Sequence, residues 1–366
     1  MPTPHPITPA PANQLAWADR LRNLATILVI ALHVSAPIAE EYTLYNTWFW
    51  WTGNLWDSLA RPAVPLFVML SGYLLLGKDY ALGGFIKKRL LRVALPALFW
   101  MLVYCYYNYR AHNDPASLMA TFKRIVQGPV HYHLWFIYLI LGLYLTYPIL
   151  RPWVRSATER DFRYFFAVCI LGTWGYKILS TFFDLKIGLY FELFTNQTGF
   201  FVLGYYLGSK ALASQAITGA ASAIRPWSLN RGQLFALALG LIAVGTASTA
   251  VGTYYCSTTI GGGKFHPFFY DYLTPNVSLS AMGWFLMVKW FFNQTRLRSV
   301  EKDFAAASFG IYFIHVLVMD WLAQAGYWQT KFHPALCIPV LIVLVTGLGF
   351  MFVLIVRALP GGTKIT

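Results

Sequence analysis

Apolar runs of about 20 residues recur along the chain from residue 22 to residue 358, with only short polar breaks between them. A helix needs a run of about that length to cross the hydrocarbon layer of a bilayer. The pattern predicts ten spans, at residues 20–39, 57–77, 90–109, 133–150, 163–182, 190–208, 232–254, 271–292, 304–325 and 335–358. Only 11% of the residues are charged, whereas soluble domains have about 25%. We therefore expect an all-α integral membrane protein, a bundle of about ten transmembrane helices without a soluble domain.

The two ends of the chain differ from this apolar body. Residues 1–16 are polar and rich in proline, which predicts a disordered N-terminal tail. No basic segment precedes a short apolar core there, so the pattern is not that of a cleavable signal peptide. The expected organisation is a tail at 1–16, one transmembrane domain at 17–360 and a C-terminal tail at 361–366.

Lysine and arginine concentrate in alternate loops between the predicted spans. Four loops hold at least three basic residues each, namely 78–89, 151–162, 209–231 and 293–303. Loop 40–56 has none and loop 255–270 has one, while the loop at 110–132 is an exception with three. Because basic loops stay in the cytoplasm, the pattern predicts that both termini are cytoplasmic. The same rule accounts for the net charge of +14, so we expect no nucleic-acid partner.

The four cysteines all lie within or at the end of apolar runs and form no CxxC pair. This spacing indicates neither a zinc site nor a redox motif, so no metal is expected.

The first span carries two basic side chains on one face. Arg22 and His33 are eleven residues apart, which on a helix is three turns plus ~20° and ~16 Å along the axis. Charged groups at membrane depth are costly and often functional. The alternative is that Arg22 anchors the helix at the interface and His33 only packs.

Further polar residues fall in the predicted outer half of the membrane. They are Arg61 beside two prolines, His133 and Trp135 at the start of the fourth span, Glu192 in the sixth, and Tyr312 and His315 on one face of the ninth. A carboxylate such as Glu192 needs a cationic partner, for which Arg61 and the histidines are candidates. Imidazoles and a carboxylate are suited to proton transfer.

Basic residues gather at the opposite, inner face. Lys88, Arg89 and Arg92 lie near the cytoplasmic end of the third span, as Arg22 does in the first. Such a group can bind an anionic, phosphate-bearing molecule. The physical hypothesis is a polar path from this basic group to the histidines.

Several of these stretches resemble the acyltransferase-3 family of membrane enzymes. They are the run from Asp19-Arg20-Leu21-Arg22 to His33, RPAVPLFVMLSGY at 61–73, FIKKRLLRVALP at 85–96, HLWF at 133–136 and SFGIYFIH at 308–315. Within that family the chain looks most like the standalone enzymes that O-acetylate surface polysaccharides or their lipid-linked precursors. The resemblance therefore implies a multi-pass enzyme of the bacterial inner membrane whose 17–360 region is an acyltransferase domain.

The resemblance also implies transfer of an acetyl group from cytoplasmic acetyl-CoA to a sugar hydroxyl. His33 would be the catalytic residue, as a base or as a transient acyl carrier, and Arg22 its partner in handling the donor. Arg89 and Arg92 would contact the CoA portion, and we add Lys88 to them. From the predicted topology we expect Arg61, His133, Trp135, Glu192, Tyr312 and His315 to bind the glycan acceptor.

Two other functions compete with this one. A transporter or flippase of a lipid-linked glycan would also need intramembrane charges and bent helices. Many secondary transporters contain an internal repeat, and none is evident in this sequence. A purely structural subunit would leave the polar residues at membrane depth unexplained. The oligomeric state and the acceptor sugar are not indicated by the sequence.

Overall fold

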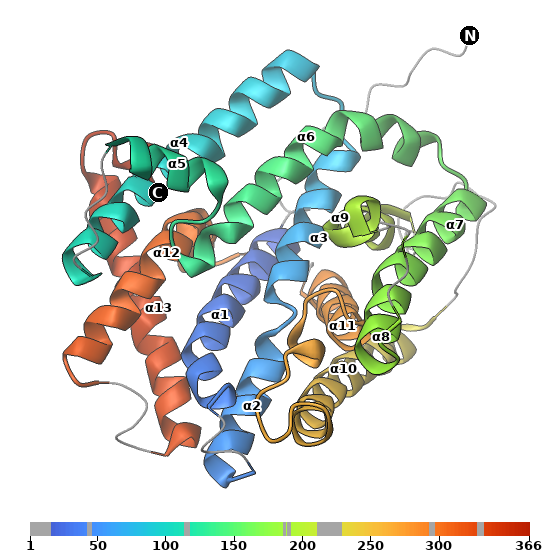
Figure 1. The fold of residues 1–366 in the computed structure, drawn as a ribbon. Coiled ribbons are helices and arrows are strands. Elements are labelled where there is room, and N and C mark those ends of the chain that lie inside the picture. Colours follow the sequence, from blue (N-terminus) through green and yellow to red (C-terminus); the bar gives the residue numbers. More distant parts are fainter. Residues whose placement is uncertain are drawn as a thin grey trace.

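The computed structural model describes residues 16–41, 46–112, 118–185, 188, 192–210, 229–292, 297–327 and 333–366. Within these ranges all regular secondary structure is helical (Figure 1). The α-helices are α1 (Ala16–Ala39), α2 (Trp48–Ala60), α3 (Ala63–Leu76), α4 (Leu82–His112), α5 (Leu118–Gln127), α6 (Trp135–Ser156), α7 (Glu159–Cys169), α8 (Tyr176–Phe182), α9 (Glu192–Tyr205), α10 (Arg231–Thr259), α11 (Pro275–Phe291), α12 (Ser299–Gln324) and α13 (Pro334–Ala358). The expected all-α fold is thus confirmed. Residues 1–15 of the predicted tail lie outside the described residues, and its last residue, Ala16, begins α1.

Eight segments in the described part of the chain are long and apolar enough to cross a membrane. They are Ala16–Ala39, Trp48–Leu76, Gly83–Arg110, Tyr132–Ser156, Glu159–Phe182, Arg231–Thr259, Ser299–Gln324 and Pro334–Ala358. The remaining two predicted spans coincide with α9 and α11, which have only 14 and 17 residues. The protein is a multi-pass membrane protein; the number of ten crossings and the cytoplasmic termini stay predictions.

Helix α1 lies at the centre of the bundle and packs against α2, α3, α11, α12 and α13 (Figure 1). Its buried face consists mainly of apolar side chains such as Leu21, Ile30 and Val34. Burial of α1 on several sides explains how a charged group on this helix can face the interior of the protein rather than lipid.

The span predicted at 57–77 begins earlier and is broken in the middle. Helices α2 and α3 meet at the turn Arg61–Pro62 within one apolar segment, Trp48–Leu76. Proline has no amide hydrogen to donate to the preceding helical turn, so two prolines close together favour a break here. The break places Arg61 at the junction of two helices.

Helices α3 and α9 pack with their backbones in close contact. A methyl group at Gly72 would overlap the carbonyl of Phe201, and one at Gly204 would overlap the carbonyl of Met69. Small residues allow such close approach, which is common between helices in membranes. The contact fixes the position of α3 against α9.

Residues 361–366, expected to form a tail, are folded against the bundle. After Gly361, whose φ is +79°, the chain forms the short helix η8 (Gly362–Lys364). This helix contacts α4 and α13. The positive φ favours glycine and turns the chain back towards the helices.

Candidate functional site

A cavity of about 890 Å³ extends along α1 between α3, α4, α6 and α12. Its wall on α1 runs from Ala18 to His33, which corresponds to ~22 Å along the helix axis. Arg22 and His33 both line it, as expected for two residues on one face. His33 is half-buried. The cavity therefore joins the two polar regions that the sequence places at opposite ends of α1.

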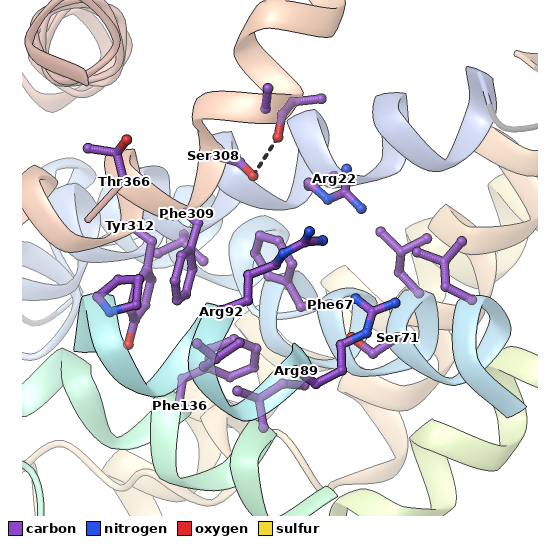
Figure 2. A pocket seen from close by; sticks show the side chains of 18 of the residues that line it. Arg22, Phe67, Ser71, Arg89, Arg92, Phe136, Ser308, Phe309, Tyr312 and Thr366 are labelled. Atoms are coloured by element: carbon purple, nitrogen blue, oxygen red, sulfur yellow. Dashed lines mark hydrogen bonds between the residues drawn. The ribbon is translucent and has the colours of Figure 1, made fainter. Parts of the chain in front are cut away.

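One end of the cavity is strongly basic. The lining of the whole cavity includes the carboxylate of Asp19 and six cationic side chains, those of Arg22, Lys78, Arg89, Arg92, Arg357 and Lys364. Asp19 is 2.8 Å from Nη1 of Arg22 and forms an ion pair with it. In Figure 2 the guanidinium groups of Arg22, Arg89 and Arg92 gather in one part of the pocket. This arrangement can bind a molecule with several phosphate groups.

The three residues predicted to contact CoA separate into two groups. Arg89 and Arg92, three residues apart on α4, line the cavity, whereas Lys88 is exposed and is not part of the lining. Helical periodicity explains the difference, because consecutive residues point about 100° apart.

Aromatic rings line the cavity between its basic end and its histidines. Phe67, Phe136, Phe309 and Tyr312 come from three helices and lie together in Figure 2. The ring centroids of Phe136 and Tyr312 are 5.9 Å apart, and those of Phe67 and Phe136 are 5.8 Å apart. These rings give the middle of the cavity apolar walls, suited to the uncharged arm of a ligand.

Four histidines from three parts of the chain meet at the far end. The ring of His33 stacks on that of His315 at 5.2 Å, and His133 lies edge-on to His315 at the same distance. Nδ1 of His131 lies 3.1 Å from Nδ1 of His133. His33 and His133 line the cavity, and His315 is fully buried behind them. The sequence singled out His33, His133 and His315, and the structure brings them together.

The hydrogen bonds of His315 determine which of its nitrogens carries hydrogen. Nδ1 of His315 lies 2.6 Å from the carbonyl oxygen of Tyr312. Because a carbonyl only accepts, Nδ1 is the donor and Nε2 of the neutral ring is an acceptor. Nε2 of His315 and Nε2 of His133 are buried and have no hydrogen-bond partner among the described residues. Both atoms can take part in moving a proton.

Tyr312 and Trp135 also line this end of the cavity. The Tyr312 hydroxyl donates to the carbonyl of His133 at 2.5 Å, which leaves its ring as the surface available to a ligand. Trp135 stacks on Tyr272, with ring centroids 5.6 Å apart and planes at 26°. Tyr272 lines the cavity as well, although it was not among the residues predicted from sequence. The only sequence signal for it was weak, namely the aromatic-rich stretch at 268–272.

Arg61 is not part of the cavity lining. It forms an ion pair with Asp57, whose side chain is fully buried, and its guanidinium lies 4.0 Å above the ring of Tyr270. Glu192 was the candidate partner of Arg61 predicted from sequence, whereas Asp57 was not predicted. The four-residue spacing of Asp57 and Arg61 on a helix was the available signal.

Two further predictions concern Glu192 and metals. The side chain of Glu192 lies outside the described part of the structure, so its role stays a prediction. Among the described residues, no group of three or more His, Cys, Asp or Glu side chains is arranged to hold a metal ion.

Of three comparisons with known proteins, one gave a match. The model described as an acyltransferase domain, that of the acyltransferase-3 family, matches residues 15–356. A search of curated proteins and a search of solved structures returned no match. The matched range includes α1 to α12 and nearly all of α13. The chain is therefore a membrane-spanning member of the acyltransferase-3 family.

Proposed function

We propose that the protein transfers an acetyl group from acetyl-CoA to a hydroxyl of a surface polysaccharide or of its lipid-linked precursor, in the bacterial inner membrane. Membership of an acyltransferase family supports the reaction class. The observation that carries the proposal is that arginines and His33 line one and the same cavity.

The basic end fits the nucleotide part of the donor. CoA has a pyrophosphate and a 3′-phosphate, and arginine forms bidentate hydrogen bonds with phosphate oxygens. Arg22, Arg89 and Arg92 would hold these groups at the cytoplasmic side. The pantetheine arm would then extend between Phe67, Phe136 and Phe309 towards His33.

His33 would act on the acceptor hydroxyl as a general base. The hydroxyl oxygen attacks the thioester carbonyl, the carbon–sulfur bond breaks, and the hydroxyl proton passes through His33 to the CoA thiolate. The products are an acetyl ester and CoA with a free thiol. His315, stacked on His33 and unpartnered at Nε2, would assist by holding or sharing this proton.

The acceptor sugar would bind where the cavity is lined by Trp135, Tyr272 and Tyr312. Stacked aromatic rings present flat apolar faces to the C–H groups of a sugar ring. His133, which lies beside Tyr312, would contact the sugar hydroxyls.

The direct test uses the purified protein in lipid nanodiscs with acetyl-CoA and an isolated lipid-linked glycan. We expect release of CoA thiol that depends on the glycan, together with acetyl esters on the glycan measured by mass spectrometry. Movement of the glycan across reconstituted vesicles without thiol release would instead assign the protein as a transporter.

Substitution of Arg89 or Arg92 tests whether the basic end of the cavity binds the donor, and the neighbouring residue Lys88 provides a control. We expect Arg89→Gln and Arg92→Gln each to raise the KM for acetyl-CoA about tenfold, because a hydrogen bond to a charged group contributes about 1.5–3 kcal/mol. The kcat should change little, since the phosphates are remote from the reacting carbonyl. Steady-state kinetics of the purified variants would measure both constants.

Lys88→Gln is the matched control, because Lys88 is adjacent on α4 but exposed and outside the lining. Its KM should stay within about twofold of the wild type, since an isolated surface charge contributes little. An equal rise in KM for Lys88→Gln would show that general positive charge, rather than the cavity, attracts the donor.

A further inference from the structure

Residues 357–366 lie beyond the range that the family model matches, yet they form part of the cavity wall. Arg357, Thr363, Lys364 and Thr366 are among the lining residues. Figure 2 shows Thr366 at the edge of the pocket, near Phe309 and Tyr312. A segment that the family model does not match thus contributes to the wall of the cavity.

Hydrogen bonds from two helices hold this segment in place. Nε1 of Trp100 on α4 donates to the carbonyl of Ile365 at 2.8 Å. Nε of Arg357 on α13 donates to Oγ1 of Thr366 at 3.1 Å, and Nη2 donates to the carbonyl of Ala306 on α12 at 2.7 Å. Arg357 therefore links α13, α12 and residue 366, and the segment has a defined position.

Close packing supports the same position. A methyl group at Gly362 would overlap the carbonyl of Val356, and one at Gly310 on α12 would lie 3.0 Å from Cβ of Thr366. Both glycines allow the segment to approach the helices. The buried side chain of Thr366 agrees with this arrangement.

Lys364 is the residue of this segment that is suited to bind an anion. It lines the cavity, is exposed, and forms no ion pair with any described residue. Arg357, in contrast, donates its hydrogen bonds to protein groups. The ammonium group of Lys364 has three donors, which suit a phosphate oxygen.

We propose that residues 359–366 complete the donor site and that Lys364 binds a phosphate group of the acyl donor. The proposal rests on the proposed function, because it takes the nucleotide part of CoA as the ligand of the basic end. It adds a phosphate-binding residue outside the matched family range, held in place by Trp100 and Arg357.

The experiment measures direct binding of CoA to the full-length protein in nanodiscs by isothermal titration calorimetry. We expect Lys364→Gln to weaken CoA binding about tenfold, which corresponds to about 1.4 kcal/mol. Lys364→Arg should restore most of the affinity because it keeps the charge. Binding of pantetheine, which has no phosphate, should be the same in the wild type and Lys364→Gln.

Lys302→Gln is the matched control, because Lys302 is exposed and lies outside the cavity lining. The proposal is overturned if Lys364→Gln binds CoA as tightly as Lys302→Gln does. It is also overturned if pantetheine binding falls to the same extent, since that would indicate a general disturbance of the cavity. Failure of the proposed function would give a different result, namely that the wild type binds CoA but transfers no acetyl group.

Discussion

Replacement of His33 by alanine is expected to lower acetyl transfer at least about 100-fold while leaving the protein folded. General acid–base catalysis by a positioned side chain contributes about 10²–10⁴-fold to a rate, and removal of His33 would remove that contribution. His33 is half-buried and lines a cavity, so its loss removes the ring contact with His315 but mainly enlarges an existing space. The measurement is the acetyl content of the cell's glycan, compared between wild type and His33→Ala at equal expression.

The control for this variant is His266→Ala, because His266 is also half-buried but does not line the cavity. It should acetylate the glycan at the wild-type level. Normal acetylation together with less glycan at the surface in His33→Ala would contradict the enzymatic role and favour the transporter. His315→Gln is expected to have an intermediate effect, because His315 contacts His33 without lining the cavity.

Replacement of Arg61 by methionine is expected to destabilise the protein by about 3–5 kcal/mol, because it leaves the buried carboxylate of Asp57 without its cation. The side chain of Asp57 is fully buried, and that of Arg61 is only 10% exposed. The same region holds Asn54, which accepts a hydrogen bond from the Tyr270 hydroxyl at 2.6 Å. Loss of the Arg61 charge should therefore lower the midpoint of thermal unfolding of the detergent-solubilised protein and the yield of folded protein.

A double variant separates this structural role from a role in acceptor binding. Replacement of a buried ion pair by apolar side chains of similar size is often neutral, so Asp57→Leu combined with Arg61→Met should regain most of the lost stability. We expect this double variant to keep most of its acetyl transfer, because Arg61 does not line the cavity. A stable double variant without activity would instead support the prediction that Arg61 binds the acceptor.

The fold class could be predicted from sequence because it depends on the local pattern of apolar residues. A run of apolar residues long enough to cross the bilayer has few alternatives to a helix, since every backbone group must be hydrogen-bonded within the membrane. The separation of Arg22 and His33 was equally informative, because helix geometry alone places residues eleven apart on nearly the same face. The structure shows both of them on the wall of one cavity.

The boundaries of the helices were harder to predict from sequence. The break at Arg61–Pro62 divides one apolar segment into α2 and α3, and the predicted span began nine residues after the first residue of α2. Hydropathy reports how apolar a stretch is and not where its helix turns, so the break was signalled only by the prolines.

The sequence by itself determined the helical membrane fold and the residues that share a face of one helix, because both depend on neighbours a few turns away. It also indicated the family, through short motifs spread along the chain. Only the tertiary structure decided which faces meet. His33 on α1, His133 in the turn before α6 and His315 on α12 are brought together. Lys364 lines the same cavity because Trp100 and Arg357 bind the segment that carries it. Contacts between helices so far apart in the chain depend on side-chain packing across the whole bundle, and no local pattern specifies that packing.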